Sequence, residues 1–328
     1  MIGLFFSLIG GILMVYYAYE FFIRRDLIPS IPERWVLVTG CDSGFGAALA
    51  RRLDSMGCHV FASCLTTAGV DRLKETCSSR TMTFLLDVSL EESVKGALQF
   101  VREHIGHSHK LWAIVNNAGI SGSVMLPSPE FHIRKDFQDV LDVNLLGMAD
   151  MMMTFLPLLK ESRGRIVNMA SIAGRSAPAM AWPYAVSKFG DEALSDSARA
   201  YLHQYGIKVS IIEPGTFATN ILSPDSVRRL AQKGFDRLSD DQRKDFREDY
   251  VELMHQFMKD TILKRFANEN LEPVVEAYVH ALFAVHPKKR YVVGLDAALF
   301  SLLSYMPSAV QDAVQRYVLT TLPAYRKK

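Results

Sequence analysis

The sequence predicts a doubly wound α/β fold: a seven-stranded parallel sheet with helices on both faces, a helical substrate lid, and a transmembrane helix ahead of them. Short apolar runs rich in β-branched residues alternate with helical patterns along the 328 residues, which is typical of parallel sheets. A glycine-rich turn separates the first run from the first helix, and the alternation breaks only at 216–270. The predicted strands lie at 35–39, 58–64, 82–86, 111–115, 164–169, 207–213 and 290–293.

The first 23 residues are nearly all apolar. Glu20 is their only charge, and Arg24 and Arg25 follow them. As a helix, 1–23 would span roughly 34 Å, enough for a bilayer core. A cleaved signal peptide is the alternative, but no positive residue precedes the run and its final tyrosines suit a membrane interface. We expect an uncleaved single-pass anchor, a linker at 24–34, and the rest of the chain on the cytosolic side, where positive flanks lie.

The turn after the first predicted strand has the composition of a phosphate cradle. Its sequence is Gly40-Cys41-Asp42-Ser43-Gly44-Phe45-Gly46, and a helical run follows. Glycines let the backbone approach a pyrophosphate, and a helix N-terminus offers free N–H groups and a positive dipole end. A tight strand-to-helix loop is the alternative. We expect a bound dinucleotide.

The end of the second strand bears on which dinucleotide binds. The run Ala62-Ser63-Cys64-Leu65-Thr66 contains neither an acidic residue for a ribose diol nor an arginine for a 2′-phosphate. The glycine turn adds one carboxylate, Asp42. A 2′-phosphate would therefore meet no cation and one negative charge, so the sequence favours NAD.

Ser171, Tyr184 and Lys188 have the spacing of an acid–base site. Tyr184 and Lys188 are four apart, so they share one face of a helix. A free tyrosine has a pKa of about 10, and a lysine ammonium beside a phenol favours its ionised form. Ser171, just after a predicted buried strand, can bond a substrate oxygen. Together they can move a proton on or off a carbinol while a hydride moves on or off its carbon.

The chain resembles the short-chain dehydrogenase/reductase family over about 35–295. The motifs are Thr39-Gly40-x-x-x-Gly44-x-Gly46, Asp87-Val88, Asn116-Asn117-Ala118-Gly119, Asn144, Ser171, Tyr184-x-x-x-Lys188 and Pro214-Gly215-x-x-x-Thr219. Cys64-Leu65-Thr66 and Asp142-Val143-Asn144-Leu145-Leu146-Gly147 are closer to the branch of microsomal retinol dehydrogenases and 17-beta-hydroxysteroid dehydrogenases. Trp182-Pro183 departs from the small residues common before Tyr184 in that branch, which bears on the shape of the substrate pocket.

The resemblance implies roles for these residues. Tyr184, Lys188, Ser171 and Asn144 would be catalytic, with Asn144 holding a water that links Lys188 to solvent. The cofactor contacts would be Gly40, Asp42, Ser43, Gly44, Phe45, Gly46, Cys64, Asp87, Asn117, Ala118, Gly119, Tyr184, Lys188, Pro214, Gly215 and Thr219. Asp87 would lie by the adenine ring, although a cap for the next helix is its simpler role, and Thr219 would hold the nicotinamide amide. The resemblance also implies the endoplasmic reticulum membrane and allows a homodimer.

The long segment 216–270 is charged and helical, too long for a plain connection, so we expect a substrate lid there. A catalytic domain at 35–294 would contain it. The apolar extension 295–328 either packs on the lid or lies on a membrane surface. A lipid-bound enzyme suits a lipophilic alcohol, ketone or aldehyde.

The net charge of +2 argues against a nucleic-acid surface. Cys41, Cys58, Cys64 and Cys77 lack metal-type spacing, which fits free thiols. His104, His107 and His109 lie in a connection that contains Gly and Ser, so we expect a solvated loop and no metal. Two alternatives to a retinoid or steroid enzyme stay open: a 3-hydroxy-acid dehydrogenase, and an inactive nucleotide-binding scaffold.

Overall fold

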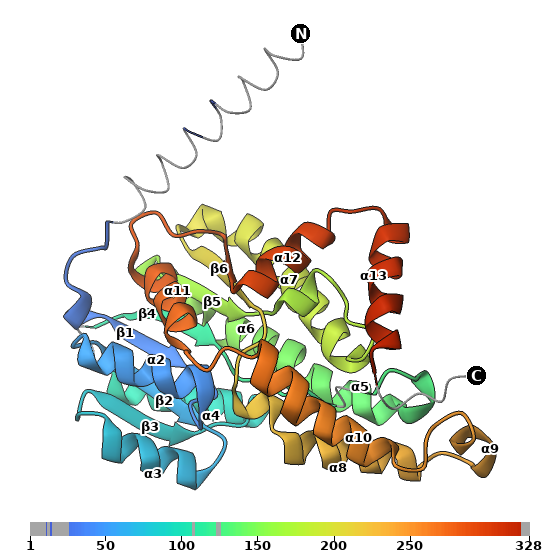
Figure 1. Ribbon diagram of the computed structural model, residues 1–328. Helices are drawn as coiled ribbons and strands as arrows, with labels where there is room; N and C mark the ends of the chain where they lie inside the picture. Colours follow the sequence, from blue (N-terminus) through green and yellow to red (C-terminus); the bar gives the residue numbers. More distant parts are fainter. Residues whose placement is uncertain (1–10, 12–13, 15–25, 107–108, 123–125, 323–328) are drawn as a thin grey trace.

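The computed structural model describes residues 26–106, 109–122 and 126–322, together with Gly11 and Met14. Its centre is one parallel sheet with strand order β3-β2-β1-β4-β5-β6-β7 (Figure 1). The predicted strands are confirmed, each to within one residue at either end. They are β1 (Trp35–Val38), β2 (His59–Cys64), β3 (Thr81–Leu85), β4 (Leu111–Asn116), β5 (Arg165–Met169), β6 (Lys208–Pro214) and β7 (Arg290–Val293).

Helices pack on both faces of the sheet, as the alternating pattern predicted. One face is covered by α2 (Gly44–Ser55), α3 (Thr67–Thr76) and α11 (Glu272–Phe283). The other is covered by α4 (Glu91–His104), α6 (Gly147–Ser162) and α7 (Trp182–Leu202). Leu49 and Leu53 of α2, four residues apart, are fully buried against the sheet, because residues at that spacing share a helix face.

A continuous helical stretch precedes β5. It consists of α5 (Arg134–Leu141), a π-helical segment (Asp142–Leu146) and α6. Among the described residues it is the one helix long and apolar enough to cross a membrane. However, Met151 and Phe155 place its apolar face against the sheet, as in a core helix. The predicted anchor, 1–23, lies outside the described residues apart from Gly11 and Met14.

The break in alternation is a helical insertion, as predicted. It contains α8 (Pro224–Asp236), α9 (Asp240–Arg243), α10 (Tyr250–Phe257) and a π-helical segment (Met258–Phe266). Its two ends meet, because Ala218 N–H donates to Asn268 O and Asn268 N–H donates to Thr216 O, both at 3.0 Å. The insertion therefore leaves and rejoins the body at one place, and its helices lie at the lower right of Figure 1.

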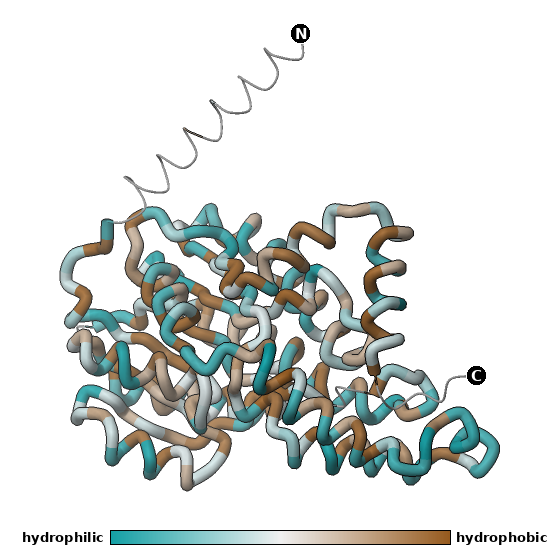
Figure 2. The backbone as a smooth tube through the Cα atoms, viewed as in Figure 1, coloured by the Kyte–Doolittle hydropathy of each residue, from teal (hydrophilic) through white to brown (hydrophobic). Residues whose placement is uncertain are grey.

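The C-terminal extension forms α12 (Leu295–Leu303) and α13 (Ser308–Thr320). Leu319 and Leu322 pack into an apolar cluster with the insertion, so the end of this extension packs on the lid segment. By contrast, Leu295, Leu299 and Leu302 of α12 are 80%, 61% and 60% exposed. Figure 2 shows apolar residues along the central strands and again along α12, whereas the turns around α9 are polar.

Candidate active site

The glycine-rich turn joins β1 to α2 through contacts too close for a larger residue. Gly40 has φ +69°, and a Cβ there would lie 2.7 Å from the Cα of Ala118. In the first turn of α2, a Cβ on Gly46 would overlap the carbonyl oxygen of Gly40. Ser43 occupies the N-cap without capping the helix through its hydroxyl. The open N-terminus of α2 therefore lies beside bare backbone, which fits a dinucleotide pyrophosphate.

The start of the lid segment lies against this turn. The rings of Phe45 and Phe217 meet edge to face, with centroids 5.4 Å apart. The Cβ of Thr219 lies 3.5 Å from where a Cβ of Gly44 would be. Residues about 175 positions apart in sequence are therefore neighbours beside the glycine turn.

Pro214 ends β6, and Gly215 opens the connection to the lid. Gly215 N–H donates to Val293 O at 2.9 Å. The carboxylate of Asp296 accepts from Thr216 N–H at 2.6 Å and leaves no room for a side chain at Gly215. Asp296 was not predicted; it lies some 80 residues away in sequence, and only the fold brings it here.

Asp42 belongs to the glycine turn after β1, and its carboxylate lies beside the end of β2. The ribose of a dinucleotide is held at that strand end in this class of fold. Its carboxylate accepts from Leu65 N–H at 2.7 Å and from Thr66 N–H at 3.0 Å. The expectation that no cation lies near the place of a 2′-phosphate is wrong. Arg72 of α3 donates to the backbone oxygen of Asp42 at 3.0 Å. Cys64 is fully buried, and burial raises the pKa of its thiol to about 12.

The loop after β4 is tied to the glycine turn. Thr39 Oγ1 accepts from the N–H groups of Asn117 and Ala118, both at 3.0 Å. Asn117 Nδ2 donates to the carbonyl oxygens of Thr39 and Gly40, and Tyr278 donates its hydroxyl to Asn117 Oδ1 at 3.1 Å. Asn117 is thus a brace for the turn. Tyr278, on α11, had no signal in the sequence.

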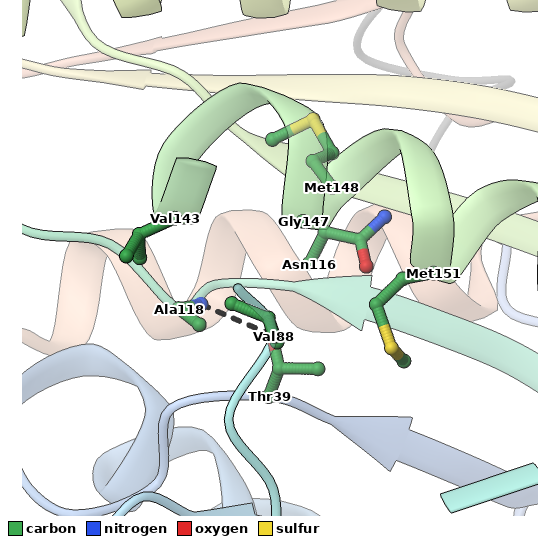
Figure 3. Close-up of a pocket in the computed structure, with 8 residues that line it drawn as sticks. All are labelled: Thr39, Val88, Asn116, Ala118, Val143, Gly147, Met148 and Met151. Carbon is green, nitrogen blue, oxygen red and sulfur yellow. Dashed lines mark hydrogen bonds between the residues drawn. The ribbon is translucent and has the colours of Figure 1, made fainter. Parts of the chain in front are cut away.

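Behind this loop lies a cavity of about 10 Å³ (Figure 3). It is about the size of one water molecule, so it is not a substrate pocket. The residues around it are Thr39, Val88, Asn116, Ala118, Val143, Gly147, Met148 and Met151. Asn116 Nδ2 donates to Asn168 Oδ1 at 2.9 Å, which links β4 to β5.

Asp87 follows β3 and is half-buried. Its Oδ1 accepts from the N–H of Ser89 at 2.9 Å and from its hydroxyl at 2.6 Å. Leu90, not Asp87, is the N-cap of α4. Asp87 therefore stabilises the turn that precedes the helix, a variant of the capping role expected from sequence.

Asn144 lies in the π-helical segment between α5 and α6, not in the regular helix that was expected. It is fully buried. Its carboxamide exchanges two hydrogen bonds with the backbone of Ile120, at 2.8 and 3.0 Å. It also donates to Ser187 Oγ at 2.9 Å, and that hydroxyl donates to Tyr184 O at 2.8 Å. Asn144 thus binds α7 between the tyrosine and the lysine; π-turns of this kind are frequent at functional sites.

Tyr184 and Lys188 lie on α7, and Ser171 lies after β5, where the chain packs on that helix. Ser171 starts a short 3₁₀ turn (Ile172–Gly174), and its Oγ accepts from Ala173 N–H at 3.2 Å. A Cβ on Gly174 would lie 2.5 Å from the carbonyl oxygen of Lys188, so this turn packs tightly on α7. The ammonium of Lys188 lies 5.7 Å from the centroid of the Tyr184 ring.

Trp182 and Pro183 begin α7. Proline suits the first turn of a helix because its missing N–H would have no partner there. Trp182 donates its indole N–H to Ala179 O at 2.7 Å and stacks on His132. The pair that departs from the family pattern therefore fixes the start of the helix that carries Tyr184.

The charge of Lys188 is held in a buried setting. Its Nζ donates to Met169 O at 2.9 Å and to Asp191 Oδ2 at 2.8 Å. Burial alone would lower the pKa of Lys188, but the Asp191 carboxylate and Tyr184 outweigh it and raise that pKa. Burial raises the pKa of Asp191 to about 6, although the Lys188 ammonium opposes the rise, and the 2.8 Å contact between the two groups has the geometry of an ion pair. The sequence-based site did not include Asp191.

The histidines considered for a metal lie away from this site. His104 ends α4, and His109 lies against the ring of Trp35, whereas His107 lies outside the described residues. In the part of the chain that the structure describes, no three His, Cys, Asp or Glu side chains are grouped as a metal site needs. The four cysteines are free thiols.

With this geometry in view, comparisons with known proteins identify the family. The family model described as short chain dehydrogenase matches residues 34–229. The chain belongs to the short-chain dehydrogenase family. Mouse retinol dehydrogenase 16 is 42% identical over 90% of this chain and 92% of its own length. Human 17-beta-hydroxysteroid dehydrogenase type 6 is 38% identical over 93% of this chain and 94% of its own. These matches place the chain in the retinol and hydroxysteroid dehydrogenase branch.

A solved short-chain dehydrogenase from Streptomyces avermitilis has a similar fold, with a TM-score of 0.67 and 23% identity. The match covers 88% of this chain and 97% of that one. The family match and the two relatives make the protein an oxidoreductase of the alcohol dehydrogenase type.

Proposed function

We propose that this short-chain dehydrogenase oxidises a lipophilic alcohol, a retinoid or a hydroxysteroid, with NAD as the hydride acceptor. One observation carries the proposal: Tyr184 lies at the edge of an apolar cluster formed by the loop before α7, the lid segment and the C-terminal helix. Cluster members include Met180, Ala181, Leu222, Tyr250, Phe257, Leu319 and Leu322. A substrate that reaches Tyr184 would bury apolar surface there, at about 25 cal/mol per Å² before the costs of binding. The names of the two relatives support the same substrate classes.

The charges of the lid argue against a small hydroxy acid. Such a substrate needs a cationic partner for its carboxylate. Three lid arginines are instead bound to acidic side chains: Arg228 to Glu252 at 3.1 Å, Arg237 to Asp136 at 2.5 Å, and Arg247 to Asp249 at 2.9 Å. Because a carboxylate already neutralises each of these guanidinium groups, the three arginines are poorer clamps for a substrate carboxylate than free ones would be.

In the proposed mechanism, Ser171 Oγ holds the substrate oxygen, and Tyr184 takes the hydroxyl proton as the carbonyl forms. Lys188, fixed by Met169 O and Asp191, favours the ionised tyrosine. Asn144 fixes α7 and supports a water path from Lys188 to solvent. When bound, the nicotinamide supplies the acceptor for the hydride from the carbinol carbon.

The cofactor would lie across the glycine turn and the ends of β2, β4 and β6. Gly40, Gly44 and Gly46 would receive the pyrophosphate at the N-terminus of α2, and Thr219 the nicotinamide amide. We propose NAD over NADP because the carboxylate of Asp42 lies at the ribose end, where it disfavours a 2′-phosphate. Arg72 works against this preference, although its guanidinium is bound to the backbone of the same residue.

We further propose that residues 1–23 anchor the enzyme in the endoplasmic reticulum membrane, with the catalytic domain in the cytosol. The chain that follows this segment is tied to the body: Ile28 N–H donates to Phe283 O at 2.7 Å and Val285 N–H donates to Asp26 O at 2.8 Å. An anchor would therefore hold the domain close to the bilayer. The exposed leucines of α12 are suited to the same apolar surface.

A substrate comparison tests the proposed function. Catalytic efficiencies with NAD are measured for all-trans-retinol, an androstane alcohol and 3-hydroxybutyrate, with enzyme in detergent or liposomes. The proposal expects turnover of at least one lipophilic alcohol and none of the small acid. Turnover of the acid alone would replace it with the hydroxy-acid alternative. A protein that binds NAD but turns over none of the three would support the scaffold alternative.

A further inference from the structure

Asp191 is a buried carboxylate beside the lysine of the site. It lies on α7 one turn after Lys188 and is 0% exposed. Its Oδ2 accepts from the Lys188 ammonium at 2.8 Å. Its Oδ1, also buried, has no hydrogen-bond partner among the residues that the structure describes. A carboxylate oxygen that is buried without a partner lowers the stability of the fold. Stability alone therefore does not explain a carboxylate at this position.

The other carboxylates of α7 bind elsewhere. Glu192 pairs with Arg290 of β7, and Asp196 pairs with Arg199 and Arg290. These pairs brace α7 against the edge of the sheet. Asp191 alone among them faces the catalytic lysine.

The elements packed around α7 bring no other charge onto this pair. Their charged or titratable groups are Arg134, Lys135, Asp136, Asp139, Asp142, Arg165, Arg175, His203, Tyr205, Lys208 and Glu213. None of these contacts Lys188 or Asp191 among the described residues: for example, Glu213 binds Arg175 and Arg290, and Arg165 donates to backbone oxygens of α11 and its end. Burial is the largest influence on both pKa values; the charged groups that shift them are Asp191 and Tyr184 for Lys188, and Lys188 for Asp191. The three side chains therefore form one isolated electrostatic unit.

We propose that Asp191 is a positioning residue for the reaction: it fixes the Lys188 ammonium and partly cancels its charge, and so sets the pH range in which Tyr184 accepts a proton. This inference rests on the proposed acid–base role of Tyr184. The ammonium favours the phenolate, and the carboxylate beyond it opposes that effect. Asp191 is two turns from Tyr184, about 10 Å along the helix, so it weakens the influence of the ammonium without abolishing it.

The sign of the effect follows directly. Replacing the carboxylate with a neutral amide removes a negative charge, so the phenolate forms at lower pH. In Asp191→Asn the amide oxygen can still accept from Lys188 Nζ, and Met169 O still does, so the nitrogen keeps its position. Loss of the carboxylate also lowers the pKa of Lys188, so the predicted shift applies over the pH range in which Lys188 stays protonated. A unit charge about 10 Å away at an effective dielectric constant near 20 corresponds to about one pH unit.

The test is the pH profile of kcat/KM for alcohol oxidation. Asp191→Asn is expected to move the rising midpoint about one pH unit lower, whereas Asp191→Glu, which keeps the charge, should stay near the wild type. Asp196→Asn makes the same chemical change on the same helix, away from Lys188, and should leave the midpoint unmoved. Asp191→Leu removes the charge with an apolar side chain of similar size and serves if the asparagine variant does not fold.

An unmoved or raised midpoint in the folded charge-removing variant would overturn the inference, even if its melting temperature fell, because a purely structural role changes stability and not the midpoint. Tyr184→Phe separates this failure from that of the proposed mechanism. If Tyr184→Phe is inactive and the Asp191 variants keep the wild-type midpoint, only the role of Asp191 is wrong. If Tyr184→Phe stays active, the proposed acid–base role itself fails.

Discussion

Gly46→Ala should weaken dinucleotide binding strongly, because the added methyl has no room. Its carbon would overlap the carbonyl oxygen of Gly40 and lie 2.5 Å from Asn117 Nδ2. Since side-chain carbons rarely approach heavy atoms closer than 3.0 Å, α2 or Asn117 must move by about 0.5 Å. Moving Asn117 breaks its bonds to Thr39 O and Gly40 O. Overpacking of this kind costs about 1–3 kcal/mol, which corresponds to roughly a 5- to 150-fold weaker affinity if the folded protein adjusts at the cradle.

Titration with NAD, followed by the quenching of tryptophan fluorescence or by calorimetry, measures this loss. Gly96→Ala is the matched control: it lies within α4, and a Cβ there meets nothing within 4 Å. It should leave binding unchanged and stabilise the protein by about 0.5–1 kcal/mol, because glycine weakens a helix interior. If Gly46→Ala bound NAD as tightly as the wild type, the cradle would not be where the dinucleotide binds.

Three further predictions concern charge and the membrane. Lys188→Ala should abolish oxidation and lower the free energy of unfolding by about 3 kcal/mol, because it leaves the Asp191 carboxylate buried and unpaired; initial rates and chemical denaturation measure both, and near-wild-type stability would contradict the ion pair. Wild-type enzyme should prefer NAD in kcat/KM, Arg72→Ala should lower the remaining use of NADP, and Leu65→Arg should raise it; a wild type that prefers NADP would refute the assignment. Deleting 1–23 should release most of the protein from membranes after cell breakage while its melting temperature stays within a few degrees, and protease should reach the catalytic domain in sealed microsomes; full-length protein that is soluble without detergent would refute the anchor.

Much of the fold followed from local sequence, and the reason is physical. Each strand of a parallel sheet is buried on both faces, so it appears as a short apolar run. Trp35-Val36-Leu37-Val38 is such a run, and all four residues are buried. The glycine turn could also be predicted from the sequence, because Gly40 and Gly46 occupy places where a Cβ cannot fit.

The residues that were missed act across long sequence distances or depend on exact helix geometry. Arg72 reaches Asp42 only because α3 packs beside β2, and Asp296 reaches Thr216 only because β7 lies beside β6. The π-turn at Asn144 has no clear sequence signature. Asp191 did carry a signal, since it follows Lys188 by three residues on a predicted helix and is therefore on the same face.

Hydride transfer from a carbinol-deuterated substrate tests the central claim most directly. The alcohol that turns over is prepared with deuterium on its carbinol carbon, and the dinucleotide product is analysed by mass spectrometry. The account predicts that deuterium appears in NADH with wild-type enzyme. With Tyr184→Phe, which keeps the ring but cannot accept the proton, it predicts transfer at under a hundredth of that rate, since general acid–base catalysis contributes about 10²–10⁴-fold, while NAD binding is unchanged. Deuterium lost to water, or a Tyr184→Phe enzyme that retains a tenth or more of the wild-type rate, would contradict it.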